Sequence, residues 1–314
     1  MKRWRAPEVV QTSLMDCGPA ALKCVLEGHG IAVPYATIRE RCLTDVDGTS
    51  IDALAALGGE LGLEAHEVLV ARDSFLLPEA DCLPAVVVTR SGAGALHFIV
   101  VWSILGPFVQ IMDPSSGRAW VRKSTLLERM ADVELPIADT TWRAWAGAEG
   151  GLAPLRARLR AVGARDAEGA QLIGAALGDP TWRALAALDA AVRMVTSLVA
   201  ADALARGAEA VRFLSGVMRR VAEGAAASET IPPRFWWATP ARVEGKLRLR
   251  GAVVVRFGPG SVPAPLETMR AECTKRSGAL PEPFAAALAK PTVAPLRRVA
   301  ELAALDHPRA ALVL

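Results

Sequence analysis

Residues 11–21 read QTSLMDCGPAA, and the structure expected for the first half of the chain follows from this stretch. Apolar residues at helical spacing come next and end at Gly28, so Cys17 stands at the start of a helix, beside Pro19. The positive end of the helix dipole favours a thiolate over a thiol there. A thiolate is the nucleophile of cysteine hydrolases, and the side-chain amide of Gln11 could donate a hydrogen bond to a developing oxyanion.

Composition and net charge limit the classes of protein to which this chain can belong. The chain has 314 residues, of which 52% are hydrophobic and 22% charged, and its net charge is +3. These values predict a packed core in two domains or one large one. They give no reason to expect a nucleic-acid partner. The basic start MKRWRAPEVV lacks the apolar run of a signal peptide, so we expect a cytoplasmic protein.

The cysteines are odd in number, scattered, and form no CxxC pair. This usage predicts reduced thiols, and it fits a disulfide framework or a zinc site poorly. Cys24 lies two helical turns after Cys17, on the same helix face, and is expected in the core. The five cysteines are Cys17, Cys24, Cys42, Cys82 and Cys273.

One apolar stretch, Ser91 to Met112, is long enough to span a membrane. Its glycines and its β-branched and aromatic core favour two strands joined at Gly106-Pro107 instead. A second apolar run, residues 184–205, carries charged residues and is a poor span. The sequence also contains no GxxxxGK[ST] phosphate loop, so we expect no ATP site in this chain.

Several motifs follow the first stretch in order: GTS before a helix that ends in LGL, then PAVVV, HFIVV and IMDPSSG. Together with the Gln-x5-Cys-Gly-Pro-Ala pattern, this order resembles the double-glycine leader peptidases, a Peptidase_C39-like family. These papain-like cysteine peptidases are usually fused to the N-terminus of bacteriocin-exporting ABC transporters. The resemblance covers about residues 6–135.

The resemblance implies Cys17 as nucleophile, His97 as general base, Asp113 as the group that orients the imidazole, and Gln11 in the oxyanion hole. The residue types suit these roles. A histidine can hold a thiolate and later protonate the leaving amine, and a carboxylate can accept the proton of its other ring nitrogen. No metal or other cofactor is expected.

Each of these residues also has a simpler interpretation. A lone cysteine near a helix start is more often a small buried residue. His97 could be a core histidine, and Asp113-Pro114 a turn that ends a strand. His29 and His66 are the alternative histidines, but the first lies in the turn after the Cys17 helix and the second in an apparent edge strand.

The second half of the chain is rich in Ala and Arg, and its apolar spacing predicts helices over 152–165, 168–177, 181–205 and 207–223. A β-like segment follows at 230–262. We therefore predict an α+β chain. A papain-like cysteine peptidase domain, with its catalytic helix packed on an antiparallel sheet, spans 1–140. A linker spans 141–151, and a mainly helical region with a small β element spans 152–314.

The leading hypothesis is a cysteine endopeptidase that removes a leader from a bacteriocin-like precursor peptide after a Gly-Gly-type site. Its partners would be that peptide and a separate membrane ABC transporter at the inner face of the membrane. The alternative is a peptidase-like module that binds a leader peptide without cutting it and serves as an adaptor to the transporter.

Overall fold

The computed structural model describes residues 4–42, 48–90, 94–223 and 227–260. Cys273, residues 43–47 and the chain beyond residue 260 lie outside the described residues. All the elements below come from one compact unit, residues 1–261.

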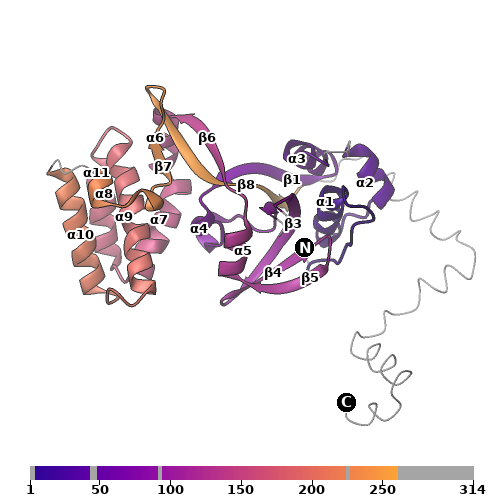
Figure 1. Ribbon diagram of the computed structural model, residues 1–314, viewed down its shortest axis with the longest axis horizontal. Helices are drawn as coiled ribbons and strands as arrows, with labels where there is room; N and C mark the ends of the chain where they lie inside the picture. The colour runs from indigo at the N-terminus through magenta and orange to yellow at the C-terminus, as the bar shows by residue number, and fades with distance from the viewer. Residues whose placement is uncertain (1–3, 43–47, 91–93, 224–226, 261–314) are drawn as a thin grey trace, which may run out of the picture. The chain divides into compact units, whose positions relative to one another are not determined.

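Three helices open the chain and cover one part of the sheet (Figure 1): α1 (Cys17–Gly28), α2 (Tyr35–Arg41) and α3 (Ile51–Glu60). Helix α1 is buried along most of its length because its small and apolar residues face the sheet. A Cβ atom at Gly28 would lie 2.0 Å from the ring of Trp102, so glycine is what allows the end of α1 to meet strand β3 closely.

An antiparallel sheet forms the centre of the first half, in the order β1-β8-β2-β3-β4-β5. Strands β3 and β4 are joined at Gly106-Pro107, so the predicted hairpin in the apolar stretch is confirmed. The strands are β1 (Leu63–Val70), β2 (Ala85–Arg90), β3 (Leu96–Leu105), β4 (Phe108–Asp113), β5 (Gly117–Arg122) and β8 (Lys246–Pro259).

The sheet contains a strand from far along the chain. The second half of β8 lies between β1 and β2, where Val70 pairs with Ala252 and Val87 with Val254. The first half of β8 pairs with two strands outside the main path, β6 (Val133–Ala138) and β7 (Ala238–Pro240). The sequence alone placed this β segment in the second region, whereas its mainly apolar residues 252–257 complete the sheet of the first.

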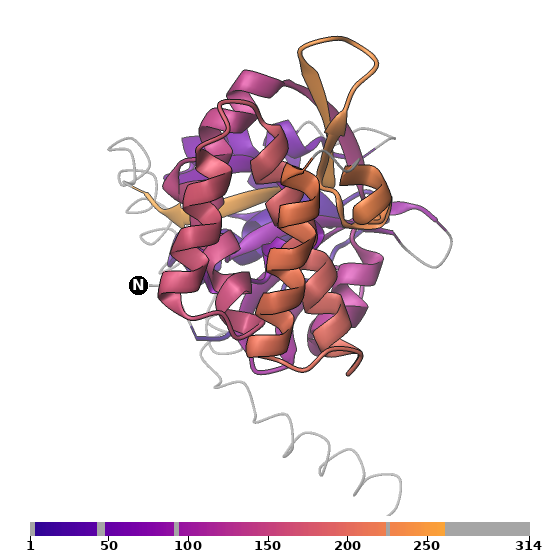
Figure 2. The ribbon, with the colours of Figure 1, turned by 90° about the vertical axis from the view of Figure 1, so that its left-hand side faces the viewer.

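Between β6 and β8 the chain forms a helical insertion, residues 139–245, whose helices Figure 2 shows from their outer side. Leu185, Leu188, Val192 and Val195 form the buried seam of its longest helix, as their spacing predicts. The helices are α6 (Asp139–Ala146), α7 (Glu149–Ala161), α8 (Asp166–Leu177), α9 (Arg183–Ala200), α10 (Ala208–Ala222) and α11 (Ala227–Thr230).

The linker prediction for 141–151 is wrong for the residues it names, because they lie in α6 and at the start of α7. Trp142 and Ala146 are four residues apart, so both face the same side of α6, and both are buried in the core of the insertion. Gly147 is the C-cap of α6 and separates the two helices without opening a flexible segment.

Short elements connect the two parts of the fold. Helix α4 (Arg72–Phe75) follows β1, and α5 (Lys123–Arg129) follows β5. The described residues also form two single turns of 3-10 helix, Pro78–Ala80 and Pro233–Phe235. The fold class is therefore the predicted one: helices packed on an antiparallel sheet, with a mainly helical second region. None of the described helices is long and apolar enough to cross a membrane.

Candidate active site

Cys17 is the first residue of α1, and its side chain is partly exposed. The segment that leads to it is tied to the sheet, since the backbone N–H of Gln11 donates to the carbonyl of Pro114 at 2.9 Å. Ala6 N–H donates to the side-chain oxygen of the buried Gln110 at 2.8 Å. These bonds place the start of α1 beside the turn between β4 and β5.

Asp16, immediately before Cys17, is fully buried yet charged. Its two carboxylate oxygens accept hydrogen bonds from Arg39 Nε at 2.9 Å and from Thr12 Oγ1 at 2.7 Å. Burial raises the pKa of Asp16, but hydrogen bonds from Thr12, Ser13 and Arg39 outweigh it and leave the pKa lowered. The Asp16 carboxylate therefore anchors the loop before Cys17 to α2.

His97 and Asp113 meet across two neighbouring strands. Nε2 of His97 lies 2.7 Å from Oδ1 of Asp113, and both side chains are largely buried. Because Asp113 occupies Nε2, the other ring nitrogen, Nδ1, remains for the thiol of Cys17. The thiol is hydrogen-bonded to the His97 side chain, so the three predicted residues are in one place.

Asp113 has further partners that hold it. Its Oδ1 also accepts from the backbone N–H of Ser115 at 2.9 Å and from the Ser115 hydroxyl at 2.7 Å. Arg129, on α5, lies 3.8 Å from Oδ2. Burial raises the pKa of Asp113, but the hydrogen bonds from His97 and Ser115 lower it to about 2. Asp113 is thus an anion at any pH near neutrality.

The electrostatics of the pair of Cys17 and His97 favour an ion pair. Hydrogen bonds to Asp113 and Cys17 raise the pKa of His97 to about 9, against the opposing effect of burial. Burial raises the pKa of the Cys17 thiol, but the hydrogen bond with His97 and the N–H groups of Phe98 and Gly18 bring it below 9.0. A cysteine in such surroundings is a nucleophile, whereas a buried neutral thiol is inert.

Gln11 is half-buried at the same site. Its side-chain oxygen is buried and has no hydrogen-bond partner among the described residues. The oxygen and the NH2 group of a side-chain amide can exchange places by a 180° flip of the amide. After such a flip, the NH2 group of Gln11 would stand where the unpaired oxygen now lies and could donate a hydrogen bond to an oxyanion. The backbone bond of Gln11 to Pro114, the residue after Asp113, places Gln11 in the same region of the fold.

The alternative residues lie elsewhere. His29 is the C-cap of α1 and packs edge-on against Trp102, with ring centroids 6.2 Å apart. His66 is exposed on β1, which is at the edge of the sheet, as predicted. Cys24 is fully buried, and burial strongly raises the pKa of its thiol. It is a core residue, as its position two turns after Cys17 predicts.

Sequence reasoning missed four residues that support the site: Asp16, Arg39, Ser115 and Arg129. For Ser115 a signal existed, since an Asp-x-Ser turn commonly closes through the side chain of the aspartate. For Arg39 and Arg129 no local signal exists, because their contacts depend on how α2 and α5 pack. In the part of the chain that the structure describes, no group of three or more His, Cys, Asp or Glu side chains could hold a metal ion.

The family comparison agrees with this geometry. A model of the Peptidase C39 family matches residues 5–141, which include all four predicted site residues. The chain belongs to the peptidase C39 family. The family match ends at residue 141 and so leaves out the helical insertion and β8.

Its relatives fall into two groups. The lactococcin-G-processing and transport ATP-binding protein LagD of Lactococcus lactis is 28% identical over 117 residues, which is 37% of this chain and 16% of LagD. The transport/processing ATP-binding protein ComA of Streptococcus pneumoniae is 32% identical over 116 residues, again 37% of this chain and 16% of the relative. The chain thus spans only a small part of these transporters. An uncharacterized protein of Methanothermobacter marburgensis is 30% identical over 125 residues, 39% of this chain and 83% of that protein.

Among solved structures, the peptidase domain of Streptococcus ComA has 24% sequence identity and a TM-score of 0.38, covering 40% of this chain and 93% of that one. A double glycine motif protease from an AMS/PCAT transporter, in complex with the leader peptide, has 21% identity and a TM-score of 0.36. That match covers 41% of this chain and 89% of the protease chain.

Proposed function

We propose that this chain is a cysteine endopeptidase that cuts a precursor peptide after a Gly-Gly-type pair of small residues and so releases an N-terminal leader. The observation that carries the proposal is the contact of Nε2 of His97 with Asp113 at 2.7 Å while the thiol hydrogen-bonds to the same imidazole. Membership of the C39 family supports the reaction class. The names of LagD and ComA support a secreted peptide as substrate.

In the proposed mechanism, Cys17 is a thiolate and His97 an imidazolium before the substrate binds. The thiolate attacks the carbonyl carbon of the scissile bond, and the carbonyl oxygen becomes an oxyanion. The side-chain amide of Gln11 and the backbone N–H of Cys17 donate hydrogen bonds to that oxyanion. The imidazolium then protonates the leaving amine, and a thioester to Cys17 remains.

Water completes the cycle. The neutral imidazole of His97 removes a proton from a water molecule, which attacks the thioester and releases the leader as a free acid. Asp113 keeps the ring in place in both steps and stabilises its protonated form. The roles of Ser115 and Arg129 are to hold the Asp113 carboxylate. No metal ion takes part in any of these steps.

The proposed place of action is the cytoplasmic face of the membrane, beside a separate ABC transporter that exports the mature peptide. The relatives supply this inference, since LagD and ComA are named as transport and processing proteins. The chain matches only 16% of the length of each of these relatives.

The test is cleavage of a synthetic peptide with a Gly-Gly leader junction by the full chain and by Cys17→Ala, followed by mass spectrometry. Cleavage after Gly-Gly that is absent in Cys17→Ala is expected. The same peptide with Val-Val at the junction is the matched control and should remain intact. Binding of the leader without cleavage, by both proteins, would refute the peptidase and support the adaptor that binds a leader without cutting it.

A further inference from the structure

A groove of about 860 Å³ lies in the helical insertion, where α8 and α10 end and α9 begins. Both α8 and α10 pack against α9 (Figure 2), and the segment that leads from α11 into β7 forms a further wall. The groove lies outside residues 5–141, the part of the chain that matches the C39 family. None of the four proposed active-site residues lines it.

Most of the groove surface is apolar. Its largest apolar side chains are half-buried: each packs on the core of the insertion and leaves part of its surface exposed at the groove. They are Leu172, Trp182, Met218, Val221 and Trp236. The indole N–H of Trp236 donates to the carbonyl of Ile231 at 3.1 Å, so this ring presents carbon atoms and no unmet polar group. Small-molecule sites typically have such walls and a volume of about 300–1,000 Å³.

Two arginines line the groove without an anionic partner. Arg183 and Arg219 are both exposed, and neither forms an ion pair within the described part of the chain. The guanidinium of Arg183 lies over the ring of Trp182, 5.4 Å from its centroid, which holds this charge at the groove wall. An arginine stacked on a ring keeps the N–H groups in its own plane available to an anion.

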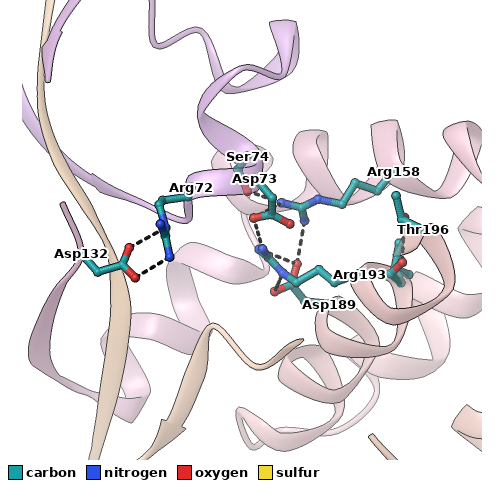
Figure 3. Close-up of polar contacts among 9 residues, drawn as sticks. Arg72, Asp73, Ser74, Asp132, Arg158, Asp189, Arg193 and Thr196 are labelled. Carbon is teal, nitrogen blue, oxygen red and sulfur yellow. Dashed lines mark hydrogen bonds and ion pairs between the residues drawn. The ribbon is translucent and has the colours of Figure 1, made fainter. Parts of the chain in front are cut away.

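Five other arginines of the insertion have carboxylate partners. Arg158 donates to Asp189 at 2.8 Å, and Arg193 contacts both Asp189 and Asp73 (Figure 3). The other three pairs are Arg156 with Glu149, Arg160 with Asp166, and Arg165 with Glu168. The insertion thus supplies anions to these cations but not to the two at the groove.

Asp179 is the acidic residue on the described walls of the groove, and its carboxylate is engaged with the backbone. Its Oδ1 accepts from the N–H of Thr181 at 2.8 Å. Its Oδ2 accepts from the Thr181 hydroxyl at 3.0 Å and from the N–H of Ala184 at 3.2 Å. These bonds hold the carboxylate at the start of α9, where it satisfies free N–H groups. Two cations therefore face one anion that is already used, and the groove keeps a positive charge.

We propose that this groove binds a small amphipathic anion, an apolar chain or ring with one carboxylate. The apolar body would cover the exposed parts of Met218 and Trp236, and the carboxylate would bind the cations of Arg183 and Arg219. Burial of apolar surface supplies most of the binding free energy. The two cations select the charge of the ligand, because a neutral molecule leaves them unpaired and a cation is repelled.

The test measures the affinity of the full chain for three probes with the same ten-carbon chain, by isothermal titration calorimetry near neutral pH. The probes are decanoate, 1-decanol and decylammonium. Decanoate should bind saturably with a Kd of roughly 10–100 μM. The alcohol should bind about tenfold more weakly, and the cation more weakly still. Raising the salt concentration from about 20 mM to about 500 mM should reduce the difference between decanoate and 1-decanol, because salt screens exposed charges.

Three variants locate the site. Arg183→Gln combined with Arg219→Gln should weaken the binding of decanoate about tenfold and leave that of 1-decanol unchanged. Ala175 is exposed on α8 and lines the groove, so Ala175→Trp should fill part of the groove and weaken both probes. Arg160→Gln is the matched control: this arginine is exposed, lies outside the groove and pairs with Asp166. It should bind all three probes like the parent chain.

The comparison of the probes on the parent chain keeps the proposal open to refutation even if a variant does not fold. Equal affinity for decanoate and 1-decanol would overturn it, because the arginines would then select nothing. So would the absence of saturable decanoate binding, or binding that a folded Ala175→Trp variant leaves unchanged. Cleavage of the leader peptide is not measured, so the outcome is independent of the proposed peptidase activity.

Discussion

Nε2 of His97, on β3, lies 2.7 Å from Oδ1 of Asp113, at the end of β4. The pairing of β3 with β4 sets this distance, because Val100 pairs with Met112, Asp113 is the next residue of β4, and His97 lies three residues before Val100 in β3. The contact leaves Nδ1 of the ring for the thiol of Cys17, and the hydrogen bonds to Asp113 and Cys17 raise the pKa of His97 to about 9. The chemistry of the site depends on this one pair more than on any other.

The pH dependence of cleavage follows from these pKa shifts. The value of kcat/KM should rise with pH through the lowered pKa of Cys17, as the thiolate forms. It should fall above about 9, where the imidazolium of His97 loses its proton. Asp113→Asn removes the largest cause of the raised pKa of His97, so the alkaline limb of the pH profile of kcat/KM should move to lower pH. The rate at pH 7 should fall by roughly 100-fold or more.

The control for that experiment is Ser115→Ala, which keeps the Asp113 carboxylate but removes the hydroxyl that donates to it at 2.7 Å. Its effect on the rate should be below about tenfold, the size expected for one hydrogen bond. An alkaline limb that stays in place in Asp113→Asn would show that Asp113 does not set the pKa of His97.

Gln11→Glu should lower kcat by about 100-fold, because the carboxylate has the shape of the amide but lacks the N–H that stabilises the oxyanion. Alkylation of Cys17 by iodoacetamide involves no oxyanion, so its rate should fall far less than the rate of cleavage. A parallel loss in both rates would mean that Gln11 acts on the thiol and not on the transition state.

The thiols should differ sharply in reactivity. Iodoacetamide at neutral pH should label Cys17 long before the other described cysteines, because burial raises the pKa of Cys42 to about 12 and that of Cys82 to about 11. His97→Ala should slow the labelling of Cys17 by removing its hydrogen-bond partner. Mass spectrometry of the labelled peptides gives the rates, and similar rates for Cys17 and Cys82 would contradict an activated thiol.

The sheet should not form without β8. A fragment ending at residue 140 lacks the strand between β1 and β2, so its cooperative unfolding and its near-ultraviolet circular dichroism should be lost. In the β6–β8 ladder Ala138 faces Lys246. An Asn-Gly turn can therefore replace residues 139–245 in a shortened chain.

That shortened chain should recover both signals, together with fast labelling of Cys17, because it keeps every strand of the main sheet. A folded and reactive fragment 1–140 would contradict the role assigned to β8. The two proteins differ in β8 and not in the helical insertion, which both lack, so their comparison isolates the strand.

Arg158, a buried arginine of α7 that donates to Ser74 of α4, should stabilise the folded chain. Arg158 is 5% exposed and its pKa is lowered by burial. Arg158→Ala leaves Asp189 with one cation fewer and should lower the free energy of unfolding by about 3 kcal/mol. Arg160→Ala, in the same helix but largely exposed, should change it by less than about 0.5 kcal/mol. Urea unfolding measures both, and equal effects would contradict the importance of burial.

The sequence by itself determined the local parts of this protein. The apolar spacing after Cys17 depends only on residues within one helix, and the alternating apolar strands around Gly106-Pro107 depend only on one hairpin. Both were predicted correctly, because the signals for helix starts and tight hairpins act over a few residues. The helical seam of α9 is confirmed for the same reason.

Only the tertiary structure decided where β8 belongs. Its pairing of Leu63 with Pro259 joins residues 196 positions apart, and a β-like pattern does not state which sheet a strand enters. The same holds for Arg129 beside Asp113 and for Arg158 beside Ser74. Long-range packing places these groups together, and the free energy of burial that drives it depends on the whole core and not on the neighbouring sequence.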